Sequence, residues 1–473
     1  MDKDSYKVLL IYPPSNWTFW NWLPEGVSRL TSHLKNKGFN VKQENLDVKC
    51  FYHNHVSKSN RSKIDMNVFN DCNRVTNFLM GWTDSYIEEN IQKMLNCIEI
   101  NKTNLIAFSI PFDEQYLTSL CLAKKIKEKS NAKIVFGGRG ILWNAFETLQ
   151  KFNFVDYVIK GEGEASLPIL CNMLRKNRIV ESRIPGLVYR KKGTVFGNKI
   201  KYFNLNKIPI PSYENVNLYI KIKKMGFIGG INIPYQVSRG CDGKCIFCGF
   251  ENKNIFLRSP EKIVSDLKNI SKKYKGYSFF LACNTINIKN EHLSGICEKI
   301  KKNELKIKWA SFARPRNLTL KLLQLMKEAG CYEIEYGVET GSQKLLNYLK
   351  KGLRVEEIEN VLKNTKKAGI AVKINLILNI PGETEEDVEE TISFIKKNSK
   401  NIDKVIIHKF FLALGSAMYK ESHKLHKISD DIQNFEKIKE LFSILKDKKI
   451  HVIAPRIGDR LLMSSGHGIY HEW

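Results

Sequence analysis

The sequence lacks a long hydrophobic run. Among its 473 residues, no stretch of 18 or more consecutive apolar residues occurs, whereas a helix that crosses a membrane needs about 20. The first residues are polar and lead directly into a strand-like apolar stretch at residues 8–12, a pattern unlike that of a secretory signal. We therefore expect no membrane span and a cytoplasmic protein.

Motifs of several common enzyme classes are also missing. The G-x-S-x-G motif of serine hydrolases does not occur, and the glycine-rich residues 137–140 do not form a Walker loop. Two histidine pairs, 423 with 426 and 467 with 471, have no cysteine or metalloprotease-type glutamate in their motifs. We interpret these histidines as structural or surface residues.

Acidic residues are scarce relative to basic ones, with 49 Asp and Glu against 76 Lys and Arg, a net charge of +27. The lysines alternate with acids along expected helices, for example in residues 298–304, and no stripe of Arg and aromatic residues occurs. We therefore expect the lysines to lie on solvent-exposed helix faces, and we do not expect nucleic acid to be a partner. Eleven cysteines, an odd number without a disulfide-scaffold pattern, indicate a reducing compartment.

Three of these cysteines are concentrated in one motif. Cys241, Cys245 and Cys248 have C-x3-C-x2-C spacing and follow a short apolar run. Three thiolates on one loop can hold three irons of a 4Fe-4S cluster and leave the fourth iron open to a substrate. Structural zinc usually takes two pairs of ligands, and no second C-x2-C pair follows. The spacing therefore predicts a catalytic iron–sulfur site.

The N-terminal part alternates expected strands and helices over residues 1–175. Such alternation predicts a doubly wound parallel sheet with helices on both faces, and ligands of these sheets bind at the carboxyl ends of the strands. Residues 50–96 are irregular to helical and hard to place, and residues 176–232 read as a bridging segment with a short hairpin. The residues expected at the ligand edge are Ser109, Gly137, Gly138, Gly161 and Glu162.

Residues 233–425 repeat strand, loop and helix about six times. Six such units predict a partial (β/α)6 barrel, whose active site lies at the carboxyl ends of the strands. The cysteine loop follows the first of these strands, and the third strand is expected at residues 306–310. Residues 426–473 read as a short helical segment and a tail.

The cysteine loop and the segments after it resemble the radical S-adenosylmethionine (SAM) enzymes. Residues 256–260 resemble the segment after the cluster loop, residues 328–342 the fourth-strand signature, and residues 380–391 the fifth. Asn379 departs from the pattern, because a glycine is usual there, and residues 282–284 and 414–416 also differ. The resemblance implies a 4Fe-4S cluster, SAM, and an external one-electron reductant such as flavodoxin or ferredoxin.

The same resemblance implies a role for individual residues. The three cysteines would hold the cluster, and the open iron would chelate the amino and carboxylate groups of SAM. An electron from the cluster would then cleave SAM to a 5′-deoxyadenosyl radical. The implied SAM contacts are Ser311 and Arg314 at the carboxylate, Glu339 at the ribose, and Asn375 with the backbone of Phe247 at the adenosine.

The N-terminal part resembles the flavodoxin-like, cobalamin-binding domain that precedes many radical SAM cores. The matching markers are residues 12–14, 108–109, 137–138 and 156–164. The D-x-H-x-x-G motif is absent and Arg139 stands where a histidine is common, so no histidine from that motif would coordinate cobalt. The resemblance implies cobalamin at the five ligand-edge residues, and a scaffold without cobalamin is the alternative. An aromatic cluster at residues 17–22 could equally cover a bound ligand or pack into the core against the second domain.

Together these features predict an enzyme that methylates an unactivated carbon or phosphorus of a small molecule or peptide. One alternative is radical cyclisation, rearrangement or oxidation without methyl transfer. A second is a binding module whose cluster only senses redox state. The substrate lies beyond what the residues specify.

Overall fold

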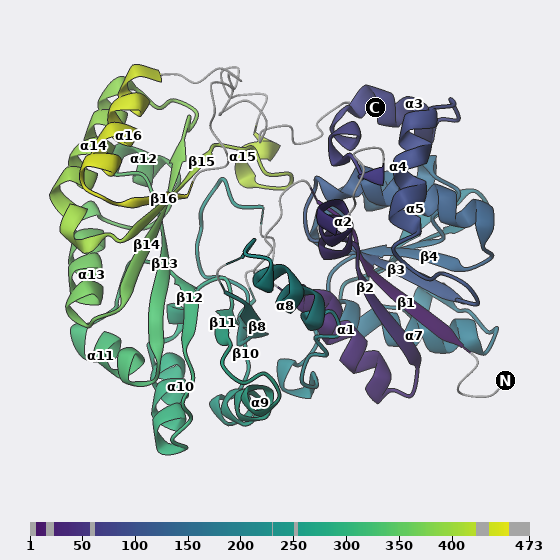
Figure 1. The fold of residues 1–473 in the computed structure, drawn as a ribbon, viewed down its shortest axis with the longest axis horizontal. Coiled ribbons are helices and arrows are strands. Elements are labelled where there is room, and N and C mark those ends of the chain that lie inside the picture. Colours follow the sequence, from purple (N-terminus) through teal and green to yellow (C-terminus); the bar gives the residue numbers. More distant parts are fainter. Residues whose placement is uncertain are drawn as a thin grey trace. The chain divides into compact units, whose positions relative to one another are not determined.

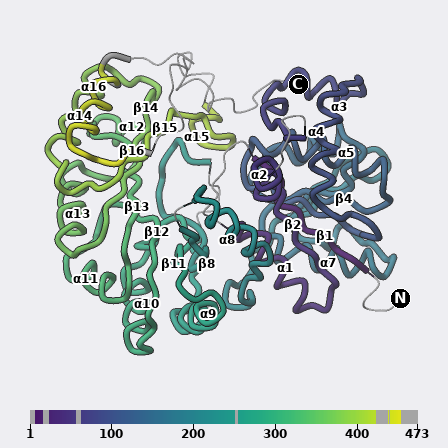
Figure 2. The backbone as a smooth tube through the Cα atoms, viewed as in Figure 1, coloured from purple at the N-terminus to yellow at the C-terminus, as the bar shows by residue number. Residues whose placement is uncertain are grey.

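The chain folds as two α/β units, residues 1–232 and residues 233–472. The computed structural model describes residues 6–15, 23–56, 62–228, 230–249, 254–421 and 435–453. Within these ranges, no helix is long and apolar enough to cross a membrane. Figures 1 and 2 trace the two units from the purple N-terminal strands to the yellow C-terminal helix.

The first unit is built on a seven-stranded sheet in the order β2-β1-β3-β4-β5-β6-β7. Strands β1 to β5 are parallel, whereas β6 and β7 add an antiparallel hairpin at the edge. The order 2-1-3-4-5 is that of flavodoxin-like folds. The strands are β1 (Lys7–Tyr12), β2 (Asn40–Asn45), β3 (Leu105–Ser109), β4 (Lys133–Gly137), β5 (Tyr157–Ile159), β6 (Leu187–Lys191) and β7 (Thr194–Gly197).

Helices cover both faces of this sheet because its central strands are apolar on both sides, as parallel sheets require. Val8 and Leu10 pack with Val27 and Leu170 under α1 and α7, while Leu9 is buried on the opposite face. Figure 1 shows α5 on that opposite face, beside α3 and α4. The helices are α1 (Glu25–Asn36), α2 (Leu46–Val56), α3 (Cys72–Leu79), α4 (Ser85–Leu95), α5 (Gln115–Lys129), α6 (Ala145–Lys151), α7 (Gly163–Arg175) and α8 (Val216–Lys224).

The second unit is an open, barrel-like sheet in the order β16-β15-β14-β13-β12-β11-β8. The pairs from β11 to β16 are parallel. A two-residue antiparallel pair, β9 with β10, stands apart from this sheet. The strands are β8 (Asn232–Gln236), β9 (Ser238–Arg239), β10 (Phe256–Leu257), β11 (Ser278–Ala282), β12 (Trp309–Ala313), β13 (Cys331–Glu339), β14 (Ala371–Leu378), β15 (Lys404–Lys409) and β16 (His451–Ile453).

Helices connect these strands and pack on the outside of the sheet, as α11, α13 and α14 do in Figure 1. Ser259 caps α9 by accepting a hydrogen bond from the Lys262 amide, and Pro260 occupies the first helical position. The helices are α9 (Pro260–Lys273), α10 (Asn290–Lys302), α11 (Leu320–Glu328), α12 (Gln343–Tyr348), α13 (Val355–Lys367), α14 (Glu385–Asn398), α15 (Ala417–Lys420) and α16 (Phe435–Asp447).

Two strands differ from the expectation. The third strand of the second unit begins at Trp309, three residues later than predicted, because residues 309–311 pair with Phe279–Leu281 of β11. Ser311 therefore lies within β12 and not after it. The C-terminal segment adds a seventh strand, β16, parallel to β15, where the sequence predicted only a helix and a tail.

Alternation along β14 separates two environments. Val372, Ile374 and Leu376 are buried on the face that the helices cover, whereas Lys373 and Asn375 on the other face are half-buried. The inner face of β14 thus carries polar residues, and those nearest the carboxyl end of the strand lie toward the end of the sheet at which a barrel of this kind holds its ligands.

Candidate functional site

The cysteine loop leaves the sheet at the carboxyl end of β8 and runs between β9 and β10. Its first turn requires glycine at position 240. Gly240 has a φ of 90°, and a Cβ there would lie 2.0 Å from the Asn254 backbone oxygen. The loop therefore turns sharply and packs directly against the strand that closes it.

The three loop cysteines are half-buried and free of disulfides. The Gly243 amide donates a hydrogen bond to Cys241 Sγ at 3.3 Å, and the Cys248 amide donates to the Cys245 oxygen at 3.4 Å. An amide N–H aimed at a sulfur stabilises its thiolate form, which is the form that binds iron. This donor set fits a 4Fe-4S cluster held at three corners.

The residues between the second and third cysteines anchor the loop to the end of α12 and to α15. The Ile246 amide donates to the Leu349 oxygen at 3.1 Å, and the Ile246 oxygen accepts from the Met418 amide at 3.0 Å. The side chains of Ile246 and Phe247 pack on a small apolar cluster that includes Leu349, Phe410 and Met418. The loop is thus held both by backbone hydrogen bonds and by the packing of its apolar side chains.

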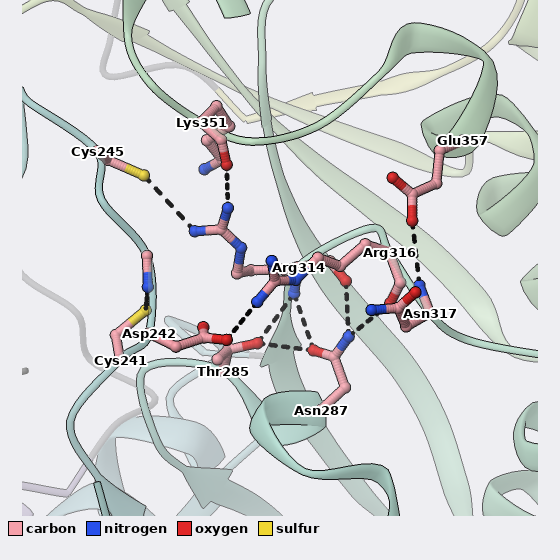
Figure 3. A network of polar contacts seen from close by, with 11 residues as sticks. Cys241, Asp242, Cys245, Thr285, Asn287, Arg314, Arg316, Asn317, Lys351 and Glu357 are labelled. Atoms are coloured by element: carbon pink, nitrogen blue, oxygen red, sulfur yellow. Dashed lines mark hydrogen bonds and ion pairs between the residues drawn. The ribbon is translucent and has the colours of Figure 1, made fainter. Parts of the chain in front are cut away.

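Arg314, just after β12, reaches the loop from the opposite side (Figure 3). Its Nη1 lies 3.5 Å from Cys245 Sγ, and its Nη2 donates to the Lys351 backbone oxygen. The side chain is buried, and its Nε has no hydrogen-bond partner. A fixed positive charge beside the sulfur favours the thiolate, while the unpartnered Nε leaves one donor available to a ligand.

The position of Arg314 is itself fixed by a side chain from the preceding unit of the barrel. Asn287 accepts from the Arg314 amide at 3.1 Å and donates to the Arg314 oxygen at 2.9 Å. Arg316, two residues on, forms an ion pair with Asp242 inside the cysteine loop. Figure 3 shows the resulting network, in which one strand end contacts the loop at two places.

Glu339 ends β13 in an unusual conformation. Its φ is 73°, in the left-handed region that residues other than glycine seldom adopt, and the β13–β14 register shifts between Gly337 and Glu339. The carboxylate forms an ion pair with the buried Lys351, whose Nζ lies 5.8 Å from the Phe247 ring centroid. Strain of this kind persists where surrounding contacts enforce it, often at functional sites.

Asn375 lies on the inner face of β14. Its Nδ2 donates to Glu335 Oε1 at 2.9 Å, and its Oδ1 is buried without a partner. Glu335 also pairs with Lys373 at 2.7 Å. His408 of β15 is exposed and experiences the charges of Glu339 and Glu335. The inner face therefore presents the unsatisfied Asn375 Oδ1 beside the ion pair of Glu335 and Lys373.

Ser311 is placed differently from the other predicted SAM contacts. It is fully buried within β12, and its hydroxyl donates to the Leu281 oxygen at 2.7 Å. The same hydroxyl lies 3.3 Å from Cys283 Sγ. Lys351 thus contacts Phe247, Arg314 and Glu339. Ser311 instead forms its hydrogen bond with the neighbouring strand, β11.

Lys351 was missed by the sequence reasoning, although it contacts three of the predicted residues. Its backbone oxygen binds Arg314, its ammonium binds Glu339, and the ammonium also approaches Phe247. The one local signal was a lysine directly before Gly352, which has a φ of 64°. A turn after the fourth-strand signature could have drawn attention to it.

In the first unit, the predicted ligand-edge glycines shape loops against the chain itself. Gly138 has a φ of 111°, and a Cβ there would lie 2.3 Å from the Ile110 oxygen. The Ile110 amide donates to the Gly137 oxygen at 2.7 Å. The loops after β3 and β4 are therefore in close contact at the carboxyl edge, where Ser109 ends β3.

The loop after β5 also packs closely against other parts of the chain. Gly161 has a φ of 85°, and a Cβ there would lie 2.6 Å from Ile200 Cγ2. The Glu162 carboxylate accepts a hydrogen bond from the Phe203 amide. The aromatic cluster predicted at residues 17–22 lies outside the described residues, as do both histidine pairs, 423 with 426 and 467 with 471.

Carboxyl groups also gather near this edge, and the sequence reasoning did not single them out. Burial raises the pKa of Asp47, which follows β2, to about 7, and burial raises the pKa of Glu114, after β3, to about 7. The Ser15 amide donates to Asp47 Oδ1 at 2.9 Å. Near neutral pH these groups can hold or release protons, which gives the edge a titratable character.

Comparisons with known proteins agree with this architecture. The family model of the Radical SAM superfamily matches residues 235–395, which include the cysteine loop and strands β11 to β14. Among curated proteins, an uncharacterized methyltransferase of Pyrococcus horikoshii is 30% identical over 281 residues. That similarity covers 58% of this chain and 60% of the relative.

Two solved structures share the fold over most of the chain. The cobalamin-dependent SAM radical enzyme OxsB, with aqua-cobalamin and SAM bound, matches with a TM-score of 0.65 at 19% identity, covering 95% of this chain and 56% of that chain. The radical SAM methyltransferase TsrM from Kitasatospora setae, with cobalamin and a 4Fe-4S cluster bound, matches with a TM-score of 0.66 at 15% identity, covering 88% and 74%.

These matches confirm the predicted fold class, a flavodoxin-like unit followed by a partial barrel. The chain spans 60% of the length of the Pyrococcus horikoshii relative and 56% of the OxsB chain.

Proposed function

Residues 235–395 form a radical SAM domain, a kind of domain that uses a 4Fe-4S cluster and SAM, and on that premise we propose that this protein is a cobalamin-dependent radical SAM methyltransferase. Its substrate would be a small molecule or peptide with an unactivated carbon or phosphorus centre. The observation that carries the proposal is the set of three half-buried cysteines with C-x3-C-x2-C spacing on one loop at the carboxyl end of β8.

Cys241, Cys245 and Cys248 would ligate three irons of the cluster. When bound, the cluster supplies the electron that cleaves SAM. The chain's own contribution is to position the cofactors and to exclude water from them. The Gly243 amide and the Arg314 guanidinium would support the sulfurs.

The residues that contact SAM are part of the same proposal. The unpartnered Nε of Arg314 suits a carboxylate, and the buried Oδ1 of Asn375 lacks a donor that an adenosine amino group could supply. Glu339 would accept from the ribose hydroxyls while Lys351 holds its carboxylate, and Phe247 would offer its backbone. Ser311 stays a predicted contact at the carboxylate, although its hydroxyl already donates to Leu281.

Cobalamin would bind at the carboxyl edge of the first unit. Ser109, Gly137, Gly138, Gly161 and Glu162 lie on the loops after β3, β4 and β5. The close packing of Gly138 on Ile110 brings the loops after β3 and β4 together at this edge, where cobalamin would bind. OxsB and TsrM, which share the fold, both hold cobalamin.

Two further expectations belong to this proposal. An external one-electron reductant such as flavodoxin or ferredoxin would reduce the cluster. The eleven cysteines all lie in the described ranges and form no disulfide there, which suits the reducing cytoplasm expected from their number and spacing.

Anaerobic purification followed by an absorption spectrum and by iron and cobalt analysis tests the cofactors. We expect about four irons in one cluster per chain and cobalamin after reconstitution with hydroxocobalamin. Protein that takes up iron but refuses hydroxocobalamin would contradict the cobalamin part alone. Protein that holds no cluster would contradict the whole proposal.

Product analysis separates methylation from the alternative chemistry. A reduced assay with SAM and cell extract should form 5′-deoxyadenosine together with S-adenosylhomocysteine, and the product should gain one CH2 unit. A product of unchanged mass, or one that has lost only hydrogen, would favour cyclisation, rearrangement or oxidation. Absence of both nucleoside products would favour a redox-sensing module.

A further inference from the structure

Exposed positive charges lie beside the cysteine loop in the second unit. Lys244 belongs to the loop itself, directly before Cys245, and is exposed. Lys350 and Arg354 are also exposed, and they belong to the segment that connects α12 with α13. We call Lys244, Lys350 and Arg354 the basic rim. None of these residues is among the predicted cofactor contacts.

A backbone contact holds the two segments of the basic rim next to each other. The Ile246 amide, two residues after Lys244, donates to the Leu349 oxygen at 3.1 Å. Lys350 follows Leu349 directly. The two lysines therefore belong to adjacent stretches of backbone that one hydrogen bond joins.

Arg314 connects the same two segments a second time. Its Nη1 lies 3.5 Å from Cys245 Sγ and its Nη2 donates to the Lys351 oxygen, so the guanidinium bridges the segments (Figure 3). A Cβ at Gly352 would lie 3.9 Å from Nη2. Arg354 comes two residues later, and it continues the segment that these contacts place beside the loop.

Nearby acids do not neutralise the basic rim. No ion pair joins any cation of the rim to an acid in the part of the chain that the structure describes. Between the first and third cysteines of the loop, the one acid is Asp242, and it pairs with Arg316. Residues 349–354 contain no acid, and Glu356 is the first acid that follows. The rim therefore carries net positive charge.

The rim also lies close to a proposed cluster ligand along the chain. Lys244 is joined to Cys245 by one peptide bond. Lys350 is connected to the same cysteine through the Leu349 oxygen, its hydrogen bond with the Ile246 amide, and one further peptide bond. A partner bound at the rim would thus be separated from the cluster by a short series of covalent and hydrogen bonds.

We propose that the basic rim is the docking surface for the external one-electron reductant, and that this reductant is a small protein with an acidic surface. Opposite charges on two surfaces accelerate their encounter and fix their orientation. Weak redox encounters use small interfaces, so a few cations can decide them. One electron would leave the reduced cofactor of the carrier and enter the cluster, while no bond of this chain forms or breaks. The inference rests on the proposed function.

A binding measurement tests the docking surface without turnover. The full chain, purified anaerobically and reconstituted with iron and sulfide, is titrated at low ionic strength with oxidised flavodoxin, an acidic electron carrier. Reversal of the rim charges should raise the Kd about tenfold. The variant for this test combines Lys244→Glu, Lys350→Glu and Arg354→Glu.

A control variant makes the same change in net charge at the opposite edge of the sheet. It reverses three exposed lysines in the second halves of α10 and α13, which lead into the amino ends of β12 and β14. The control substitutions are Lys302→Glu, Lys363→Glu and Lys367→Glu. We expect its Kd to stay close to that of the wild type, because the rim is intact.

Salt provides a second measurement that needs no variant. Binding of flavodoxin to the wild-type chain should weaken as the ionic strength rises, because counterions screen exposed charges. The rim variant should respond much less to salt. Arg354→Glu alone, the substitution farthest from the loop in sequence, should show a smaller change in the same direction and covers the case in which the triple variant does not fold.

Cluster reduction by flavodoxin hydroquinone, followed by stopped-flow absorption, separates docking from a change in potential. In the rim variant the second-order rate constant should fall, whereas the limiting rate at saturating flavodoxin should stay the same. Equal Kd values in the rim and control variants, at wild-type iron content, would overturn the docking surface. Failure of the proposed function would instead appear as absence of iron, so the two failures are distinguishable.

Discussion

Arg314 Nη1 lies 3.5 Å from Cys245 Sγ, so a permanent positive charge stands beside one of the three loop sulfurs. Hydrogen bonds and charges at cluster sulfurs are among the factors that set the reduction potential. A positive donor at this position stabilises the reduced cluster, which carries one more negative charge than the oxidised one.

Arg314→Gln should therefore make the cluster harder to reduce. At a fixed ambient potential, we expect the ratio of reduced to oxidised cluster to fall about tenfold, which corresponds to about 59 mV for one electron. A redox titration followed by electron paramagnetic resonance measures this. Arg316→Gln, which removes the ion pair to Asp242 but no contact with a sulfur, is the control, and an equal shift there would contradict the role of Arg314.

Loss of one loop cysteine should abolish the cluster. Cys245→Ser removes one of the three proposed ligands, so iron content and the visible absorption of the cluster should fall close to zero after reconstitution. Cys283→Ser is the matched control, because Cys283 lies after β11, outside the three-cysteine motif, and contacts Ser311. Wild-type iron content in Cys245→Ser would rule out this ligand.

Glu339 and Lys351 should be energetically coupled. Removing either partner of a buried ion pair leaves the other charge unpaired, at a cost of about 3 kcal/mol. Glu339→Gln and Lys351→Met should each lower the free energy of unfolding by an amount of that order. The double variant should lose clearly less than the sum of the two, as a urea-denaturation cycle would show. Strict additivity would argue against a coupled pair.

Stability should depend on the protonation of Glu383, which is buried in the loop after β14. Burial raises the pKa of this carboxyl from 4.5 to about 7. Between the two pKa values, 4.5 and about 7, the folded state keeps a proton on Glu383 that the unfolded chain releases. The free energy of unfolding therefore decreases as the pH rises and levels off above about 7. Glu383→Gln should flatten this dependence, because the amide does not titrate.

Denaturant titrations at several pH values between about 5 and 8 measure the slope. Glu386→Gln, an exposed neighbour in the same segment, should leave it unchanged. If the wild-type and Glu383→Gln proteins show the same slope, the carboxyl does not titrate in this window.

A comparison of two glycines should isolate the contact at the first unit's ligand edge. Gly138 and Gly81 have φ values of 111° and 110°. A Cβ at Gly138 would lie 2.3 Å from the Ile110 oxygen, whereas a Cβ at Gly81 would have no neighbour within 4 Å. Gly81→Ala should cost about 1 kcal/mol from backbone strain alone. Gly138→Ala should cost clearly more in thermal unfolding and should weaken hydroxocobalamin binding, and equal costs would contradict the close approach.

The features predicted correctly from the sequence are those with a local signal. The cysteine spacing lies within eight consecutive residues, and the alternating strands and helices repeat often enough to predict two parallel sheets. The start of β12 was wrong by three residues because pairing with β11, and not the apolar pattern of residues 306–310, decides where the strand begins.

Features that depend on distant residues were not predicted. Asn287 and Lys351 reach Arg314 from 27 and 37 residues away, and no local pattern reports such contacts. Strand β16 has only three residues, too few for a periodic signal. The elevated pKa values of Asp47 and Glu114 arise from burial, which follows from the tertiary fold.

The two backbone hydrogen bonds at Ile246 have a consequence for sequence variation in the cysteine loop. They attach the loop to Leu349 and Met418 through main-chain atoms. Main-chain groups of this kind are present whichever side chain occupies these positions. The attachment therefore constrains the backbone path of the loop at residue 246 more than it constrains the identity of the side chain there.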